Sequence, residues 1–206
     1  MAGHFIVFEG IAGSGKKTHI KFLLGKLRAM NKEAVSISFP NFVSDIGKIT
    51  KKTDFDPYTL SLLFAADRMN FQKIIKTHLD NGRIVICDRY SYSNFAYQST
   101  RDVPLDWLMD IEKNILKPET VFLIDVPVDT SMRRIQQATM ENFAREQILE
   151  RMRGQRHTLE MIRQNYLSLS KYPDQGTRWI VIDGTKSIEE IQSKIWEAVP
   201  AELKFR

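Results

Sequence analysis

Short apolar runs recur along the chain, separated by segments in which apolar residues follow helical spacing. The runs lie at residues 5–9, 34–39, 83–88, 120–125 and 179–183. Each is rich in β-branched or aromatic side chains and short enough for a buried strand. Regular alternation of such strands with helices indicates a parallel sheet covered on both faces. We therefore predict an α/β fold with a five-stranded parallel sheet, in a single domain over residues 1–206.

Local signals mark the ends of several helices. Pro57 suits the first turn of a long helix that ends near residue 81. An amphipathic pattern predicts a second helix over 105–116. Ser187 is placed to cap the last helix, with Glu190 three residues later. Because ligands of parallel sheets bind beyond the carboxyl ends of the strands, the loops that follow the apolar runs are the places to search for chemistry.

A glycine-rich segment follows the first apolar run directly. Glycine at positions 10, 13 and 15 lets the backbone turn with its N–H groups pointing inward, which forms a cradle for an anion. Lys16 stands where the next helix begins, and the helix dipole there also attracts phosphate. The pattern is that of a phosphate-binding loop (P-loop), and an ordinary strand-to-helix turn is the weaker interpretation. The candidate nucleotide-binding residues are Gly10, Ile11, Ala12, Gly13, Ser14, Gly15, Lys16, Lys17 and Thr18.

One position of this loop departs from the P-loop pattern. The pattern places Ser or Thr directly after the lysine, and that hydroxyl normally ligates magnesium. Here the position is occupied by Lys17, and Thr18 comes one residue late. We therefore expect phosphate binding at this loop and expect the magnesium ligand to come from elsewhere in the chain.

Asp88 and Arg89 stand at the end of the run 83–88. A carboxylate at the tip of an interior strand beside a P-loop is placed to hold Mg²⁺, so Asp88 is the candidate metal ligand. Arg89 offers a planar guanidinium that suits a phosphate. The alternative is a structural Asp–Arg ion pair, and the nearby P-loop favours the catalytic interpretation.

Two segments combine aromatic and polar side chains in a way that a plain core helix would not. Residues 91–98 interleave serine, asparagine and glutamine with tyrosine and phenylalanine, which suits a flat, hydrogen-bonding ligand such as a nucleobase. Phe64 and Arg68, four residues apart, share one face of the predicted long helix. Phe64 alone is typical of a core position, but an arginine on the same face indicates that this face borders a cavity.

Arginine is concentrated late in the chain. Arg145, Arg151, Arg153 and Arg156 lie within a dozen residues, with Gly154 as a candidate hinge. A solvated, charged helix is one interpretation of this local sequence. In a phosphoryl-transfer enzyme the segment would instead form a lid that folds over the phosphates, excludes water and adds positive charge.

The composition narrows the classes of partner. Lys and Arg outnumber Asp and Glu by 30 to 25, and this net charge of +5 suits nucleic acid, anionic lipid or phosphorylated small molecules, with a solvated basic surface favoured over a nucleic-acid site. No basic run is interleaved with aromatic residues, so no nucleic-acid site is expected. The single cysteine, Cys87, excludes an internal disulfide and fits a reducing compartment. With no apolar run near the roughly 20 residues of a membrane span and no signal-peptide pattern, we expect a cytoplasmic protein without membrane contact.

Together these motifs resemble the thymidylate kinase family of P-loop nucleoside monophosphate kinases. The resemblance extends over essentially the whole chain and rests on residues 8–10 with the P-loop, 39–40, 45–48, 63–68, 88–90, 93, 96–98, 117–118 and 183–185. It implies a nucleoside monophosphate kinase fold with a lid at about 138–157, and a homodimer for which the helices at 57–81 and 105–116 are the candidate surfaces. It also implies that ATP and Mg²⁺ are the cofactors and that the γ-phosphoryl group of ATP moves to dTMP.

The resemblance further implies roles for individual residues. Phe64 would stack on thymine, and Arg68 would hydrogen-bond its edge. Arg89 would hold the acceptor phosphate and Asp88 would organise magnesium, while a lid arginine would assist Lys16 in catalysis. The residues expected around the monophosphate are Phe39, Pro40, Phe64, Arg68, Arg89, Ser93, Asn94, Tyr97 and Gln98. Those expected near adenine are Gly184, Thr185 and Lys186.

Several positions depart from the family pattern. Ala12 stands where relatives carry Asp or Glu for the sugar hydroxyl, and Phe42 stands where they carry an arginine for the acceptor phosphate. Gly13 occupies the place of a catalytic arginine that some relatives have in the P-loop, so the lid is expected to supply that arginine. Two alternatives follow: a kinase for another pyrimidine monophosphate, or a nucleotide-binding module that has lost activity.

Overall fold

One parallel sheet forms the centre of the molecule. The computed structural model describes residues 3–51, 54–139, 155–172 and 176–204. Its strands are β1 (His4–Glu9), β2 (Ala34–Ser38), β3 (Ile84–Asp88), β4 (Thr120–Asp125) and β5 (Arg178–Asp183). Their order is β2-β3-β1-β4-β5, and every neighbouring pair is parallel. The predicted five-stranded parallel sheet is confirmed, and each strand lies within one residue of its expected bounds.

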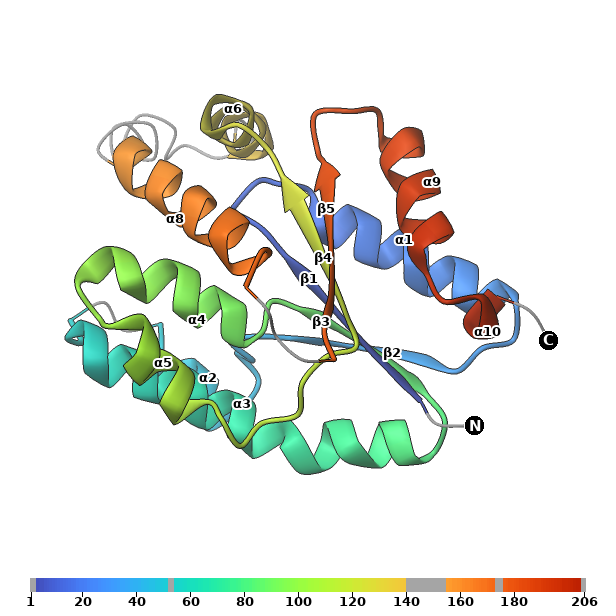
Figure 1. The fold of residues 1–206 in the computed structure, drawn as a ribbon, viewed down its shortest axis with the longest axis horizontal. Coiled ribbons are helices and arrows are strands. Elements are labelled where there is room, and N and C mark those ends of the chain that lie inside the picture. The colour runs from blue at the N-terminus through green and yellow to red at the C-terminus, as the bar shows by residue number, and fades with distance from the viewer. Residues whose placement is uncertain (1–2, 52–53, 140–154, 173–175, 205–206) are drawn as a thin grey trace.

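Helices cover both faces of the sheet, as Figure 1 shows. One face carries α1 (Lys16–Ala29) and α9 (Ile188–Ala198), and the other carries α3 (Pro57–Asp80), α4 (Ser91–Gln98) and α8 (Arg156–Leu169). The other described elements are α2 (Asp45–Ile49), the 3₁₀ turn η1 (Ser99–Arg101), α5 (Leu105–Ile111), α6 (Val128–Thr139) and α10 (Ala201–Lys204). Because successive strand residues point to opposite faces, Phe5 and Val7 of β1 join one hydrophobic core while Ile6 and Phe8 join the other.

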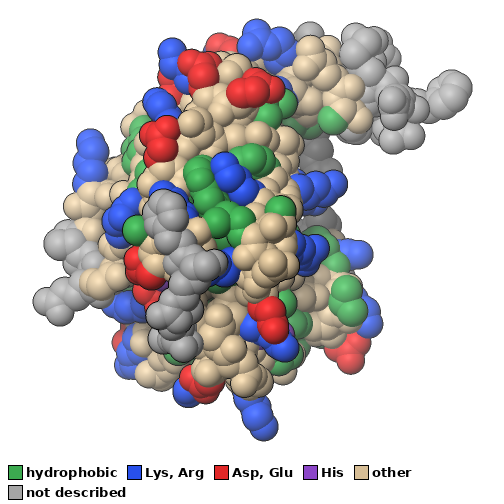
Figure 2. Space-filling model, turned by 90° about the vertical axis from the view of Figure 1, so that its right-hand side faces the viewer, with side chains coloured by type: hydrophobic (Ala, Val, Ile, Leu, Met, Phe, Trp, Pro, Cys, Tyr) green, Lys and Arg blue, Asp and Glu red, His purple; other side chains and the backbone are tan. Residues whose placement is uncertain are grey.

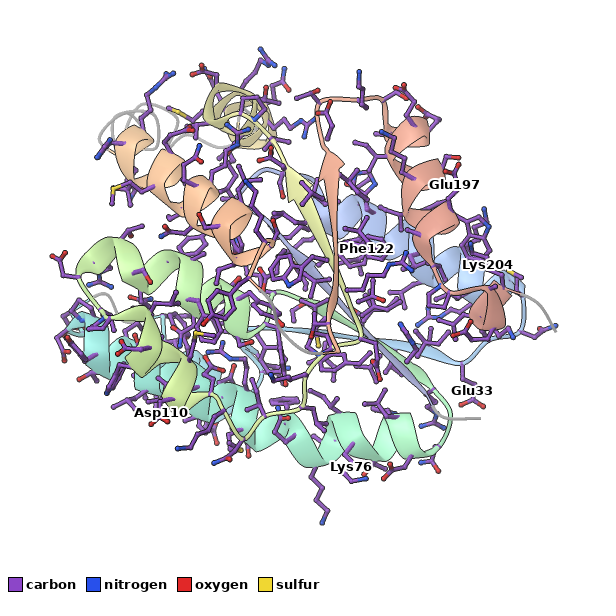
Figure 3. All side chains as sticks on the ribbon, viewed as in Figure 1. Glu33, Lys76, Asp110, Phe122, Glu197 and Lys204 are labelled. Carbon is purple, nitrogen blue, oxygen red and sulfur yellow. The ribbon has the colours of Figure 1, made fainter. Side chains whose placement is uncertain are left out.

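Apolar side chains fill the interior, and most charged side chains lie at the periphery, although a few, such as Glu9 and Arg68, are buried. Phe122 of β4 is fully buried and stands at the centre of Figure 3, whereas Lys76 and Asp110 point outward. Figure 2 shows the side of the molecule that carries α1 and α9, where lysine and arginine alternate with acidic residues around hydrophobic side chains. Among the described residues, no helix is both long and apolar enough to cross a membrane.

Two local predictions of helix ends are confirmed. Pro57 is the first residue of α3, and Asp56 caps that helix by accepting hydrogen bonds from the N–H groups of the first turn. Ser187 and Glu190 form a reciprocal capping box at the start of α9. The side chain of each residue accepts a hydrogen bond from the backbone N–H of the other.

The helix predicted over 105–116 is shorter than expected, because α5 ends at Ile111. Tertiary contacts replace the last helical turn. The carboxylate of Glu112 binds the guanidinium of Arg68, and the N–H of Leu116 donates to Gln72 Oε1 at 2.7 Å. The predicted end of this helix at residue 116 was wrong, because an amphipathic pattern carries no information about such long-range contacts.

Candidate active site

The P-loop joins β1 to α1 and requires glycine at two of its turns. Gly10 and Gly13 have backbone φ angles of +139° and +69°, which residues with a side chain rarely adopt. A Cβ on Gly10 would lie 2.6 Å from the carbonyl oxygen of Ile124, and one on Gly13 would lie 2.7 Å from that of Ser131. α1 then begins at Lys16, and its N-cap glycine brings no side chain to the first N–H groups. The first turn of α1 therefore offers these N–H groups to an anion.

Lys16 folds back into the P-loop. Its Nζ donates hydrogen bonds to the carbonyl oxygens of Gly10 (2.8 Å) and Ile11 (2.9 Å). The side chain is 7% exposed. Burial, together with the nearby charge of Arg89, lowers the pKa of Lys16 to about 7, although Asp88 opposes this shift. Above pH 8 the amine is therefore mostly neutral.

This pKa gives a pH-dependent prediction: ATP binding at pH 8.5 should take up most of one proton. A phosphate beside Nζ favours the charged ammonium and returns the pKa toward its ordinary value, whereas the phosphate itself, with a second pKa of about 6, is already deprotonated. Calorimetric titrations in buffers of different ionisation enthalpy measure the uptake. Lys16→Met should abolish it, and Lys21→Met, on the exposed side of α1, is the control. Binding without proton uptake would contradict the lowered pKa.

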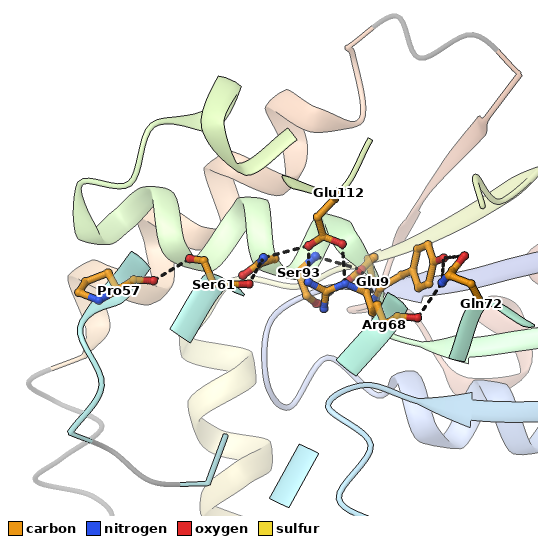
Figure 4. Close-up of polar contacts among 9 residues, drawn as sticks. Glu9, Pro57, Ser61, Arg68, Gln72, Ser93 and Glu112 are labelled. Carbon is orange, nitrogen blue, oxygen red and sulfur yellow. Dashed lines mark hydrogen bonds and ion pairs between the residues drawn. The ribbon is translucent and has the colours of Figure 1, made fainter. Parts of the chain in front are cut away.

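Glu9, at the end of β1, is a buried acceptor that the sequence analysis did not assign to the site. Its Oε1 accepts the N–H groups of Tyr90 (2.8 Å) and Ser93 (3.2 Å). Its Oε2 accepts the hydroxyls of Ser93 (2.7 Å) and Tyr166 (2.9 Å), and Figure 4 shows Glu9 beside Ser93. Burial raises the pKa of Glu9, while Arg89 and the surrounding donors oppose the shift. These partners are 81 to 157 residues away along the chain, beyond the reach of any local pattern.

Removing this acceptor is expected to destabilise the fold. In Glu9→Ala four buried or partly buried hydrogen bonds lose their acceptor, so the free energy of unfolding should fall by about 3 kcal/mol. Urea denaturation measures this change. The matched control is Glu33→Ala, which removes an exposed ion pair with Arg83 and should cost about 1 kcal/mol or less. Equal losses in the two variants would contradict the role given to Glu9.

Arg89 follows β3 in the left-handed backbone region, with φ of +68°. Its Nη1 donates to Ser93 Oγ at 3.1 Å and to Tyr166 OH at 3.3 Å, and its Nη2 donates to Tyr97 OH at 3.2 Å. Two of these hydroxyls also hold Glu9, so the carboxylate and the guanidinium are linked through them. In the described part of the chain no ion pair joins Arg89 to Asp88, so the Asp–Arg pair considered from the sequence is not formed there.

Asp88, the last residue of β3, is 8% exposed. Its Oδ1 is buried and has no hydrogen-bond partner among the described residues. Its charge acts on Lys16, so it lies near the phosphate loop. Mg²⁺ at phosphate sites is bound by one or two carboxylates together with substrate oxygens and water, and an unpartnered carboxylate oxygen fits this role. Within the described ranges, no group of three or more potential metal ligands is found.

A cavity of about 510 Å³ gathers the residues expected around the monophosphate. All nine of them line it, although they come from the turn after β2, from α3, and from the segment 89–98. Ala12 lines it too, so the P-loop borders this cavity. The remaining lining residues are Leu60, Thr100, Arg101, Thr158 and Ile162.

Arg68 lines the cavity, but its guanidinium is also bound by Glu112. Arg68 Nε donates to Glu112 Oε2 at 2.7 Å, and Nη2 donates to the other carboxylate oxygen. Both side chains are almost completely buried. Glu112 could not be recognised from the sequence, because no periodicity relates positions 44 residues apart.

Comparison with known proteins identifies the family. The thymidylate kinase family model matches residues 8–195. A probable thymidylate kinase of Methanocaldococcus jannaschii is 39% identical over 197 residues, which cover 93% of each chain. One of Pyrococcus horikoshii is 36% identical over 98% of each chain, and a thymidylate kinase of Plasmodium falciparum is 34% identical over 98% of this chain and 95% of its own. The chain belongs to the thymidylate kinase family. The resemblance drawn from the motifs is confirmed.

In this member of the thymidylate kinase family, most of the expected lid at about 138–157 lies outside the described residues. Arg145, Arg151 and Arg153 also lie outside the described residues, so their catalytic role stays a prediction. Arg156 begins α8, and its Nη1 lies 2.6 Å from Asp129 Oδ1 in an exposed ion pair. The residues that bring α8 to the cavity are Thr158 and Ile162.

The loop expected near adenine in this thymidylate kinase family member lies next to the P-loop. Arg134 of α6 joins the two loops, since its Nη1 donates to the carbonyl oxygen of Ser14 at 3.3 Å and its Nη2 to that of Gly184 at 2.8 Å. Thr185 is held by Asp183, whose Oδ1 accepts both its N–H and its hydroxyl. Arg134 could not be recognised from the sequence, because an arginine on an amphipathic helix resembles a surface cation.

Phe42, which replaces the expected arginine of the thymidylate kinase family, is 49% exposed. It does not line the described cavity. The Nζ of Lys51 lies 4.8 Å from the centre of its ring. Among the described residues, Arg89 and Arg101 are the arginines other than Arg68 that line the cavity, and Arg89 is the one held by hydroxyls beside Glu9.

Proposed function

We propose that this member of the thymidylate kinase family transfers the γ-phosphoryl group of ATP to dTMP and forms dTDP. The observation that supports this most strongly is the cavity in which all nine residues expected around the monophosphate meet beside the P-loop. Phe64 offers a ring on which a flat base can stack, and Arg89 offers a forked cation for the acceptor phosphate.

ATP is proposed to bind on the P-loop side. Its phosphates would meet the N–H groups of the first turn of α1, and Lys16 would turn from its carbonyl partners toward them. Gly184, Thr185 and Lys186 would lie near adenine, since Arg134 holds this loop against the P-loop. The reaction needs no covalent intermediate, because positioning and neutralisation of the phosphoryl oxygens supply the catalysis.

Asp88 is the residue proposed to hold Mg²⁺, and Oδ1 is the oxygen available for it. When bound, the ion would neutralise charge on the phosphate oxygens. Lys17 is exposed at the position of the usual hydroxyl ligand and adds a positive charge there. A magnesium titration of activity tests this part of the proposal: we expect strict dependence on Mg²⁺, and full activity in a chelator would contradict it.

The lid arginines are proposed to complete the phosphoryl-transfer site. Among the described residues, the side chain of Arg156 is held by an exposed ion pair with Asp129, and such pairs contribute little, so breaking this one costs little free energy. Alanine variants of Arg145, Arg151, Arg153 and Arg156, assayed singly, identify the catalytic one by a fall in kcat that leaves the KM for ATP nearly unchanged. Four variants with unchanged kcat would contradict a lid arginine in catalysis.

A coupled kinase assay with ATP and a panel of dTMP, dUMP, dCMP, UMP and CMP tests the proposed function. We expect kcat/KM to be highest for dTMP. Higher kcat/KM for another member of the panel would instead assign that pyrimidine monophosphate. ATP binding without turnover of any of them would indicate a nucleotide-binding module, the alternative that Lys17 and Ala12 raise.

A homodimer and a cytoplasmic location belong to the same proposal. Leu62 and Met69, two turns apart on α3, are 49% and 43% exposed, and Tyr58 of the same helix contacts Trp107 of α5 with ring centres 5.0 Å apart. These helices therefore offer an apolar surface to a second copy. Light scattering tests the dimer, and a monomer at micromolar concentration would contradict it. The buried free thiol of Cys87 fits a reducing compartment, which cell fractionation tests.

A further inference from the structure

Glu112, the residue that follows α5, carries a deeply buried carboxylate behind the cavity wall. Its side chain is 1% exposed. It binds Arg68 through both carboxylate oxygens, and Oε1 also accepts a hydrogen bond from Asn94 Nδ2 at 2.9 Å. Figure 4 shows the carboxylate above the guanidinium, between α3 and α4. Arg68 and Asn94 both line the cavity proposed for the monophosphate.

These contacts fix the direction of the Asn94 amide. Both partners of Nδ2 are acceptors, the carbonyl oxygen of Ser61 at 3.2 Å and the carboxylate of Glu112. An amide oxygen in that place would face two acceptors, so only one of the two amide orientations satisfies the contacts. Asn94 Oδ1 consequently points the other way. It is buried and has no hydrogen-bond partner in the described part of the chain.

Glu112 orients Arg68 in the same way. The carboxylate takes the Nε and Nη2 sides of the guanidinium, and Nη1 has no acceptor among the described residues. A guanidinium can only donate hydrogen bonds. The cavity wall thus combines an unsatisfied amide acceptor, from Asn94, with an N–H donor, from Arg68.

This acceptor and this donor match the hydrogen-bonding edge of one class of pyrimidine. A 4-oxo pyrimidine such as thymine or uracil presents an N–H donor at N3 beside a carbonyl acceptor at C4. Cytosine presents an acceptor at N3 and an amino donor at C4, the reverse arrangement. A buried polar group left without its partner is costly, so a site built for one pattern rejects the other strongly.

We propose that Glu112 is the specificity-positioning residue of the base site: by fixing the direction of the Asn94 amide and the Arg68 guanidinium, it selects 4-oxo over 4-amino pyrimidine monophosphates. The inference rests on the proposed function, since it assigns the cavity to the base. Glu112 itself is bound to protein groups and acts through its two partners.

The test is the variant Glu112→Gln, which replaces one acceptor oxygen with an NH₂ donor. In either orientation the new NH₂ group faces a donor of Arg68, so the paired contact is broken, and at the Oε1 position it also removes the constraint on the Asn94 amide. Dissociation constants for dTMP, dUMP and dCMP are measured by calorimetry, and kcat/KM is measured alongside. We expect the preference for dTMP over dCMP to fall at least tenfold in affinity, with dUMP following dTMP. A role in structure alone would weaken all three ligands equally, and that result would overturn the proposal.

Controls separate this inference from the proposed function. Glu119→Gln changes an exposed carboxylate that accepts the N–H of Phe5, and it should leave the affinity ratio unchanged. Should Glu112→Gln fail to fold, Asn94→Ala removes the unsatisfied acceptor while it leaves the Arg68–Glu112 pair in place. The same fall in the dTMP to dCMP ratio is expected there, and an unchanged ratio would overturn the proposal. The ratio of dTMP to dCMP affinity is measured by binding and does not depend on catalysis. A wild-type protein that binds dTMP but does not phosphorylate it would therefore contradict the proposed function and leave this inference intact.

Discussion

Lys16→Ala is expected to lower kcat for dTMP phosphorylation by about 10³-fold or more, because single charges that neutralise the transferred phosphoryl group are worth that much. Lys16 is the cation at the start of α1, where the P-loop offers its N–H groups. Its amine donates to two backbone carbonyl oxygens of the loop, so the charge lies at the loop that is proposed to hold the phosphates. A coupled assay with saturating ATP and dTMP measures the loss.

The control for this experiment is Lys21→Ala, which removes an exposed lysine further along α1. It should keep kcat within about twofold, since surface substitutions away from a site have small effects. Thermal unfolding shows whether each variant remains folded. A Lys16→Ala protein that is folded and retains kcat within tenfold of wild type would exclude the P-loop as the site of phosphoryl transfer.

Arg89→Met is expected to reduce kcat/KM for dTMP by about 10³-fold, because truncating one partner of a buried charge-assisted contact costs several kcal/mol. The Arg89 guanidinium is held by three hydroxyls at the cavity wall, which keeps its fork in one orientation for the acceptor phosphate. Methionine keeps the unbranched stem of arginine. The positive φ at position 89 disfavours arginine and methionine alike, so the substitution tests the loss of the charge.

Two measurements make this prediction specific. The affinity for ATP should change by less than about tenfold, since Arg89 lines the monophosphate cavity. Arg83→Met, which removes an exposed arginine paired with Glu33, should leave kcat/KM unchanged. Equal losses of ATP and dTMP affinity in Arg89→Met would show that the residue acts through the fold of the site as a whole.

The elements could be predicted from the sequence because their signals are local. A buried strand needs an apolar run, and β4 was found over its full length for that reason. The P-loop was equally visible, since Gly10 and Gly13 occupy backbone conformations and close approaches that other residues cannot. The end of α5 was not visible, because Glu112 and Leu116 leave the helix for partners on α3.

The residues of the candidate site likewise fall into those that motifs predicted and those that only the tertiary structure reveals. Motifs named the nine residues around the monophosphate, and the tertiary structure brings all of them to one cavity. The groups that hold them were missed. Glu9 contacts Tyr166 across 157 positions, and Glu112 contacts Arg68 across 44. Such contacts depend on which strands are neighbours and on which helices cover each face, and no repeat of two or 3.6 residues carries that information.

By itself, therefore, the sequence determined the parallel sheet, the phosphate loop, and the residue types offered to a nucleotide. Only the tertiary structure decided which way those side chains are turned. The sheet order β2-β3-β1-β4-β5 places β1 between β3 and β4, so that Glu9 and Arg89 share hydroxyls at one edge. The packing of α3, α4 and α5 closes Glu112 over Arg68 and Asn94, because a buried carboxylate is stable only where several donors surround it.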